Sequence, residues 1–169
     1  MAPTPMTRYV TGPDRARFRF PEKVRASFGF LETDYGFSAE SVDESHASWT
    51  SQRVTVTVVH GSGSYELDVL IRPTPRTPAG LLRALRGDGG TPFGLRDVAS
   101  WRQAADILRQ MPLIVEEPDD MHDALDRLAG WTRTLADPLL RGDFRQLRAL
   151  DRAVTKNDRE ATKRFGRGE

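Results

Sequence analysis

Cysteine is absent from this chain of 169 residues. Its absence excludes a disulfide framework, a thiolate nucleophile and a zinc site with cysteine ligands. Apolar runs are short, and none approaches the roughly 20 residues that a membrane-spanning helix requires. The N-terminal residues, Met1 to Pro5, lack the apolar core of a signal peptide. We therefore expect a soluble, cytoplasmic protein with no membrane partner.

Lysine is scarce, and neither sign of charge dominates. The 25 basic side chains include only Lys23, Lys156 and Lys163 as lysines, and 24 acidic side chains leave a formal net charge of +1. The whole molecule therefore exerts no strong electrostatic attraction on nucleic acid. The length and a 38% apolar content favour one globular domain. We predict a flexible segment over 1–20, a domain over 21–154 and a polar tail over 155–169.

Alternating apolar residues predict an antiparallel hairpin over 53–60 and 65–72. Apolar side chains occupy every second position on both sides of a Gly/Ser turn at 61–64, which is the pattern of strands with one buried face. Shorter strands over 37–43 and 46–50 complete a sheet of three or four strands. Pro73, Pro75 and Pro78 then end the ladder pairing.

Helical spacing dominates the rest of the chain. A first helix is expected from Pro21, and Gly36 ends it in a left-handed conformation. Further helices are expected after Pro78, over 95–108 and from Asp143. The clearest amphipathic stripe comprises Met121, Leu125, Leu128, Trp131 and Leu135. These patterns predict an α+β fold: an N-terminal helix, an antiparallel sheet, and a helical C-terminal half packed on one sheet face.

Residues for catalysis are sparse. His46, His60 and His122 show no i, i+4 pairing that would make a zinc site, and no serine occupies a nucleophile elbow. The glycines at 87–90 lack the lysine of a phosphate-binding loop. We predict no enzyme, no cofactor and no metal site, with a small hydrolase as the third functional hypothesis.

An acidic segment over 116–126 is the most charged local feature. It is interpreted as helix-capping charge favoured by the helix dipole, as a docking surface for a basic partner, or as a divalent-cation site. Trp49, on the least regular strand, is a candidate exposed anchor for binding. The acidic side chains are Glu116, Glu117, Asp119, Asp120, Asp123 and Asp126.

Basic residues at both ends of the chain support an alternative, nucleic-acid binding. Phe18 and Phe20 lie between the N-terminal arginines and could stack on bases, while the basic groups contact phosphate. The plainer interpretation is two solvated basic ends with both phenylalanines packed under the first helix. The residues are Arg15, Arg17, Arg19, Lys156, Arg159, Lys163 and Arg164.

The pattern Phe28-x-Phe30-Leu31-Glu32-x-x-Tyr35-Gly36-Phe37, followed by the valine-rich hairpin, resembles a group of small bacterial (actinobacterial-type) α+β proteins. The string Pro138-Leu139-Leu140-Arg141-Gly142-Asp143-Phe144 is similar to their C-terminal helical part. The resemblance covers roughly 24–150 and carries no catalytic signature. Some similar proteins look like immunity partners of toxins, which implies a role in interaction with another protein.

The sequence therefore favours a non-catalytic protein-binding module, an immunity or defence-associated partner in a bacterial cytoplasm. The expected surface is the acidic segment with the exposed sheet face. The expected partner is another protein, nucleic acid is the alternative, and self-association into a homo-oligomer is left open.

Overall fold

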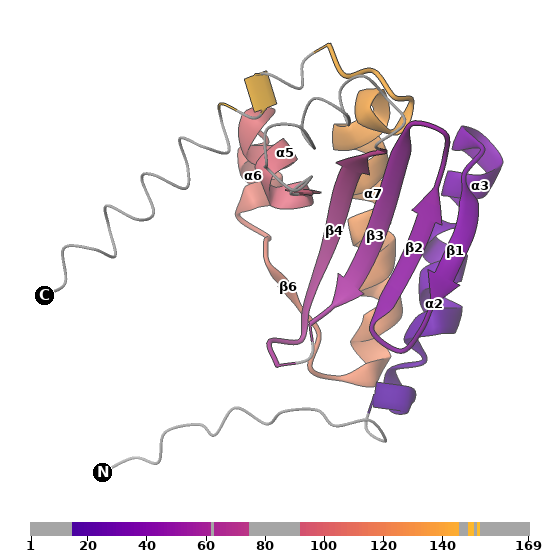
Figure 1. The fold of residues 1–169 in the computed structure, drawn as a ribbon. Helices are drawn as coiled ribbons and strands as arrows, with labels where there is room; N and C mark the ends of the chain where they lie inside the picture. Colours follow the sequence, from indigo (N-terminus) through magenta and orange to yellow (C-terminus); the bar gives the residue numbers. More distant parts are fainter. Residues whose placement is uncertain (1–14, 62, 75–91, 146–148, 151, 153–169) are drawn as a thin grey trace, which may run out of the picture.

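An antiparallel sheet forms the centre of the molecule (Figure 1). The computed structural model describes residues 15–61, 63–74, 92–145, 149, 150 and 152. Four longer strands follow one another in chain order: β1 (Ser38–Val42), β2 (His46–Thr50), β3 (Val54–His60) and β4 (Glu66–Pro73). Two short strands share the outer edge of β4: β5 (Phe93–Gly94) pairs at Leu70 and Ile71, and β6 (Leu113–Ile114) pairs at Glu66 and Leu67.

Period-two alternation in the sequence sets the register of the central hairpin. Val56 lies opposite Ile71 and Val58 opposite Val69, so that the apolar side chains of both strands share one face. On β3 and β4 the buried and partly buried positions alternate along the strand. The predicted hairpin and the predicted fold class are confirmed, and the short edge strands extend the sheet to six strands.

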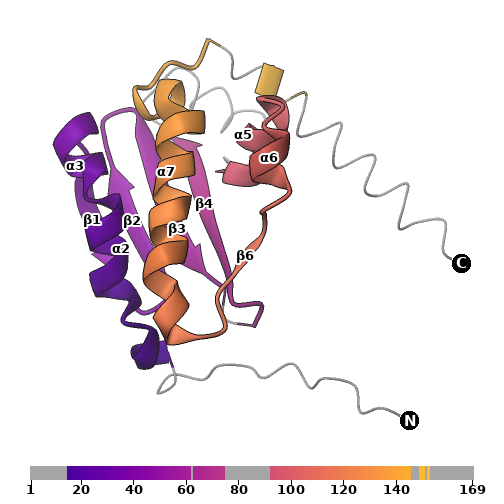
Figure 2. The same cartoon turned by 180° about the vertical axis from the view of Figure 1, so that it is seen from behind.

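Two helices cover the apolar face of the sheet (Figure 2). They are α2 (Phe20–Phe28) and the long α7 (Met121–Leu140), which contact each other, while α7 also contacts β4. The predicted stripe of α7 points inward: Met121, Leu125 and Leu128 are fully buried. Burial of such a stripe supplies most of the stability of a helix in a globular protein.

The N-terminal helical region is divided rather than continuous. α2 ends at Phe28, Gly29 follows, and α3 (Phe30–Tyr35) begins immediately after it. Both Phe28 and Phe30 are buried: Phe28 stacks on Trp49 at 6.0 Å between ring centroids, and Phe30 meets Tyr35 at 6.0 Å edge to face. Gly29 keeps right-handed helical dihedrals, φ −55° and ψ −23°, and the two phenylalanine rings also contact each other, with 5.8 Å between their centroids.

A second break divides the predicted helix over 95–108. α5 (Leu95–Trp101) and α6 (Ala105–Leu108) are separated at Gln103, whose φ of 57° lies in the left-handed region. Residues 75–91, where the sequence predicts a short helix, lie outside the described residues. The final predicted helix, from Asp143, is described only at 149, 150 and 152 beyond residue 145, and all three residues are helical.

The N-terminal boundary of the packed domain lies before residue 20. A 3-10 turn, η1 (Ala16–Phe18), buries Phe18, and Phe20 is buried at the start of α2. Residues 15–20 therefore belong to the domain and not to the flexible segment predicted over 1–20. Within the part of the chain that the structure describes, no helix has the length and apolar character needed to cross a membrane.

The second face of the sheet carries hydroxyl side chains and is not covered by α2 or α7 (Figure 1). Thr50 and Thr55 face each other across β2 and β3 with 2.8 Å between their hydroxyl oxygens, and Ser48 and Thr57 do so at 3.3 Å. These side chains are partly buried. Polar residues on one face and valines on the other are the expected pattern of an antiparallel sheet with a single packed face.

Candidate functional site

The acidic segment lies at the end of the molecule where α7 begins, at the lower end in Figure 1. It runs from the end of β6 through the 3-10 turn η2 (Pro118–Asp120) into the first turns of α7. All six predicted carboxylates are exposed; we call the set the acidic surface: Glu116, Glu117, Asp119, Asp120, Asp123 and Asp126. Asp120 occupies the N-cap position of α7, but its side chain forms no capping hydrogen bond.

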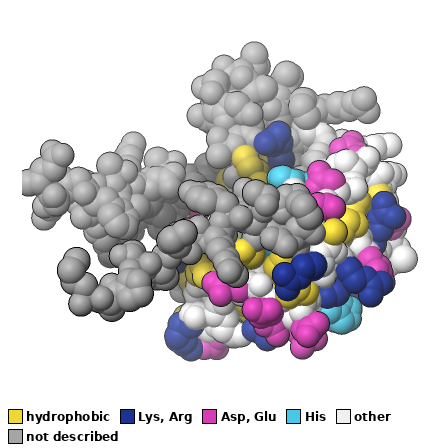
Figure 3. Space-filling model, turned by 90° about the horizontal axis from the view of Figure 1, so that it is seen from below, with side chains coloured by type: hydrophobic (Ala, Val, Ile, Leu, Met, Phe, Trp, Pro, Cys, Tyr) yellow, Lys and Arg dark blue, Asp and Glu magenta, His cyan; other side chains and the backbone are white. Residues whose placement is uncertain are grey.

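Only part of the acidic surface has a partner. Asp126 accepts a hydrogen bond from the Ser27 hydroxyl at 2.5 Å and lies 3.6 Å from His122 Nε2. The Lys23 ammonium donates a hydrogen bond to the Pro118 carbonyl at 2.7 Å, and not to a carboxylate. Figure 3 views this end of the molecule and shows acidic and basic side chains interspersed. Among described residues, the other five carboxylates form no ion pair.

Ile114 adds an apolar contact to this end of the molecule. Its side chain is 57% exposed, the only large hydrophobic side chain so exposed among the described residues. Ile114 is paired across the ladder with Glu66, which places both side chains on the same face of the sheet, and Glu116 and Glu117 follow two and three residues later. The exposed Ile114 side chain and these carboxylates therefore lie close together at the edge of the sheet.

Trp49 is not an exposed anchor, so that prediction is wrong. Its side chain is fully buried, and its indole N–H donates to Glu32 at 3.0 Å. Ala47 and Trp49 are buried on β2 while Ser48 and Thr50 between and after them are partly exposed. The same alternation is visible in the sequence and would have placed Trp49 in the core.

The basic N-terminal segment is only partly available to a ligand. Arg15 is buried, and its guanidinium donates to the His60 carbonyl at 3.0 Å. Arg19 is exposed but forms an ion pair with Glu22, and Arg17 is exposed. The predicted basic residues of the other end, Lys156, Arg159, Lys163 and Arg164, lie outside the described residues.

His60, at the end of β3, is the buried histidine. It is 2% exposed, and Phe18 lies against it with a ring-centroid distance of 5.0 Å. Burial, reinforced by the Arg15 charge, lowers the pKa of His60 from 6.5 to about 4. The nearby Val115 backbone raises this pKa slightly, although neither ring nitrogen has a hydrogen-bond partner. The imidazole is therefore neutral at pH 7.

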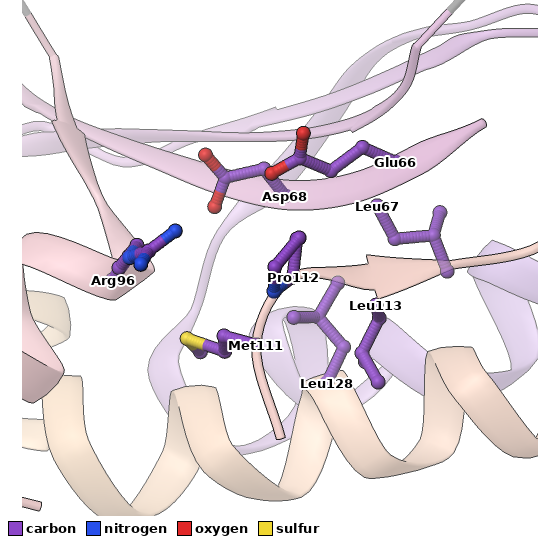
Figure 4. A pocket seen from close by; sticks show the side chains of 8 residues that line it. All are labelled: Glu66, Leu67, Asp68, Arg96, Met111, Pro112, Leu113 and Leu128. Carbon is purple, nitrogen blue, oxygen red and sulfur yellow. The ribbon is translucent and has the colours of Figure 1, made fainter. Parts of the chain in front are cut away.

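A small cavity of about 50 Å³ lies between β4, the start of α5 and the chain before β6 (Figure 4). The carboxylates of Glu66 and Asp68 lie on one side of it and Arg96 on another, with Met111 and Leu128 among the apolar lining. Small-molecule sites usually have several hundred Å³. The cavity is of a size for water or the end of one side chain and not for a nucleotide.

Asp68 ties β4 to the start of α5. Its carboxylate accepts from the Val69 N–H at 2.7 Å, and the Leu95 backbone also bonds it. A Cβ at Gly94 would lie 3.3 Å from this carboxylate, so glycine permits the close approach. Burial raises the pKa of Asp68 to about 6, the backbone hydrogen bonds lower it, and the neighbouring charges of Glu66 and Asp97 raise it further.

The two remaining histidines have local partners. His46 Nδ1 lies 2.7 Å from the Ser45 hydroxyl in the turn before β2, and Asp43 accepts the Ser45 and His46 backbone N–H groups at 2.7 Å each. His122 lies beside Asp126 on α7. His46 pairs with Val59 on the neighbouring strand and is exposed, whereas His60 is buried, so these two imidazoles lie on opposite faces of the sheet. Among the described residues, no group of three histidine or carboxylate side chains is arranged to hold a metal ion.

Comparison with known proteins returns no relatives. No protein-family model matches the chain, no curated protein matches it, and no solved structure matches its fold. The resemblance to small bacterial proteins, and the immunity role that it implies, therefore stay predictions.

Proposed function

We propose that this protein is a protein-binding module that acts without catalysis and that its partner presents a basic surface. The proposal rests on Ile114, which is exposed beside Glu66, Glu116 and Glu117. An isolated exposed apolar residue is ordinary on a protein surface. Here it is bordered by carboxylates, and the acidic surface continues from it into α7.

Burial of Ile114 in a partner supplies affinity, and the carboxylates supply orientation and speed of association. An anchor that is removed from water at the centre of an interface dominates the binding free energy, while charges at its rim mainly affect the association rate. The polar second face of the sheet adjoins this region through Glu66 and extends the available contact area.

The test uses the full chain as bait in extract of the source cell, followed by calorimetry with the purified captured protein. Ile114→Ser is expected to weaken that binding by at least tenfold. Glu116→Lys with Glu117→Lys is expected to weaken it more at low salt than at high salt, because exposed charges are screened. The matched control is Glu40→Lys with Glu44→Lys, which changes the net charge equally at the exposed β1–β2 end.

Equal binding by all variants would reject this surface. Capture of nucleic acid in place of a protein would reject protein binding. If its affinity also falls steeply between about 50 and 200 mM salt, nucleic-acid binding by the basic ends of the chain is favoured.

A further inference from the structure

Unsatisfied buried polar atoms gather at one place, the contact between η1 and the end of β3. Among the described residues, the buried side-chain atoms without a hydrogen-bond partner are Nη2 of Arg15 and both ring nitrogens of His60. Arg15 is 7% exposed and His60 is 2% exposed. The two residues are joined by the hydrogen bond from Arg15 Nη1 to the His60 carbonyl. Buried groups of this kind are rare in native proteins and call for an explanation.

Aromatic rings enclose the imidazole of His60. Phe18 of η1 lies 5.0 Å away between ring centroids, and Phe20 at the start of α2 and Tyr65 before β4 each lie 6.1 Å away. The charged group that acts on the ring is the Arg15 guanidinium, and Tyr65 is the other titratable neighbour. Among described residues, no carboxylate acts on the ring to stabilise an imidazolium.

A hinge connects η1 to the rest of the domain. Arg19 separates η1 from α2 and adopts φ 49° and ψ 37°, the left-handed region that residues with a side chain rarely occupy. Its N–H donates to the Ala16 carbonyl at 3.1 Å. Rotation at Arg19 would relieve this conformation and move η1, whereas α2 is held separately by its contacts with α7 and β2.

We propose that η1 is an acid-released latch: protonation of His60 places two cations side by side in an apolar enclosure, and η1 swings away at Arg19 while the sheet and α7 stay folded. Opening gives the imidazolium and Arg15 access to water. It also uncovers Phe18 and Tyr65 beside η2, which η1 contacts in the closed form. The latch goes beyond the proposed function and holds whether or not the acidic surface binds a protein.

The pH at which the latch opens follows from the two environments of His60. A pKa of about 4 in the closed form and of 6.5 when exposed means that the open form takes up the proton more readily between these values. The ratio of open to closed molecules therefore rises as the pH falls, by roughly 20-fold between pH 7 and pH 5 for a single histidine.

Hydrogen exchange of the full chain, measured by mass spectrometry at pH 7 and pH 5 and corrected for the intrinsic exchange rate, tests the latch. Protection of the peptide over 15–20 is expected to fall about 20-fold at pH 5, with protection over 121–140 unchanged. His60→Phe fills the enclosure without a titratable group and is expected to abolish the response. The control His122→Phe alters an exposed histidine and is expected to keep it.

Three results would overturn the latch: unchanged protection over 15–20, equal loss over 15–20 and 121–140, or a full response in His60→Phe. If His60→Phe does not fold, Arg15→Met replaces it in the test. Removing the guanidinium raises the pKa of the closed-form His60 and is expected to reduce the response, and an undiminished response in Arg15→Met would equally overturn the proposal. Partner binding is not part of this measurement, so its outcome is separate from that of the proposed function.

Discussion

The pKa values of two titratable residues move in opposite directions: that of the buried His60 is lowered and that of the partly buried Asp68 is raised. Burial is the largest cause in both cases: it favours the neutral imidazole and the neutral carboxylic acid. They lie on neighbouring strands but on opposite faces of the sheet, His60 on the buried face of β3 and Asp68 on the second face of β4. Their effects on stability therefore oppose each other in mildly acidic solution.

Asp68→Asn is expected to remove a pH-dependent part of the stability. The pKa of Asp68 is about 6 in the folded chain and 3.8 in the unfolded chain, so protonation favours folding. Its contribution is fully present below about pH 4 and is lost as the pH rises through 6. Because Asp68 keeps some contact with solvent, we expect the wild type to lose only about 1–2 kcal/mol of unfolding free energy relative to Asp68→Asn between pH 4 and pH 7. Urea denaturation at pH 4 and pH 7 measures it.

The amide in Asp68→Asn cannot ionise, so the variant gains on the wild type as the pH rises from 4 to 7. Its oxygen still accepts one of the two backbone N–H groups that the carboxylate accepts. A constant difference in unfolding free energy between variant and wild type at both pH values would contradict the assigned burial of this carboxyl.

Some of these residues were visible in the sequence and others were not. Alternation along Val54, Val56 and Val58 continues to His60 and places it on the buried face. The same alternation places Asp68 on the second face, but its partial burial depends on α5, which begins only at Leu95. The buried position of Arg15 has no periodic signal, because η1 is a single turn.

At the scale of elements, the sequence predicts types and ends better than continuity. The hairpin strands, α7 and the left-handed Gly36, at φ 69°, are confirmed. The breaks at Gly29 and Gln103 are not apparent from helical spacing. They depend on which side chains pack against the distant sheet, such as Phe28 on Trp49. Tertiary packing of this kind overrides local propensity.

Helix ends and helix interiors make opposite demands on glycine, and two positions allow a matched test. Gly36 ends α3 at a positive φ in open space, so Gly36→Ala meets backbone strain alone and is expected to destabilise the protein by about 1 kcal/mol. Gly130 lies exposed within α7, also with open space around it, so Gly130→Ala is expected to stabilise by about 0.5–1 kcal/mol.

Thermal and urea unfolding of both glycine variants measure the difference. The introduced methyl group is the same in each case, so opposite signs isolate backbone conformation from side-chain packing. A neutral or stabilising Gly36→Ala would contradict the left-handed end of α3, and a destabilising Gly130→Ala would contradict the open space around Gly130.

At the scale of the whole molecule, charge is balanced. The net charge is +1 at pH 7 and the isoelectric point is about 8.2. Proteins are least soluble where net charge vanishes, because self-repulsion is then weakest. We expect a solubility minimum near pH 8 in polyethylene glycol precipitation. The variant with Glu116→Lys and Glu117→Lys should move this minimum to higher pH, and a minimum below pH 7 in the wild type would contradict the prediction.

The predicted α+β class and the single packed face of the sheet are confirmed for the described residues. Hydrophobic alternation and helical stripes carry this information locally. The candidate surface was predicted only in part. The acidic residues are exposed as expected, but the outward orientation of Ile114, which lies between the buried Leu113 and Val115, follows only from its pairing with Glu66.

The order of the four long strands has a consequence for synthesis on the ribosome. β1 to β4 neighbour one another in chain order, so this meander is complete once Pro73 has emerged, whereas α7 ends at Leu140. At about 5–20 residues per second, the nascent sheet waits on the order of 3–13 s for that helix, with its valine-rich side bare. We therefore expect the growing chain to expose an apolar surface until α7 can pack on it.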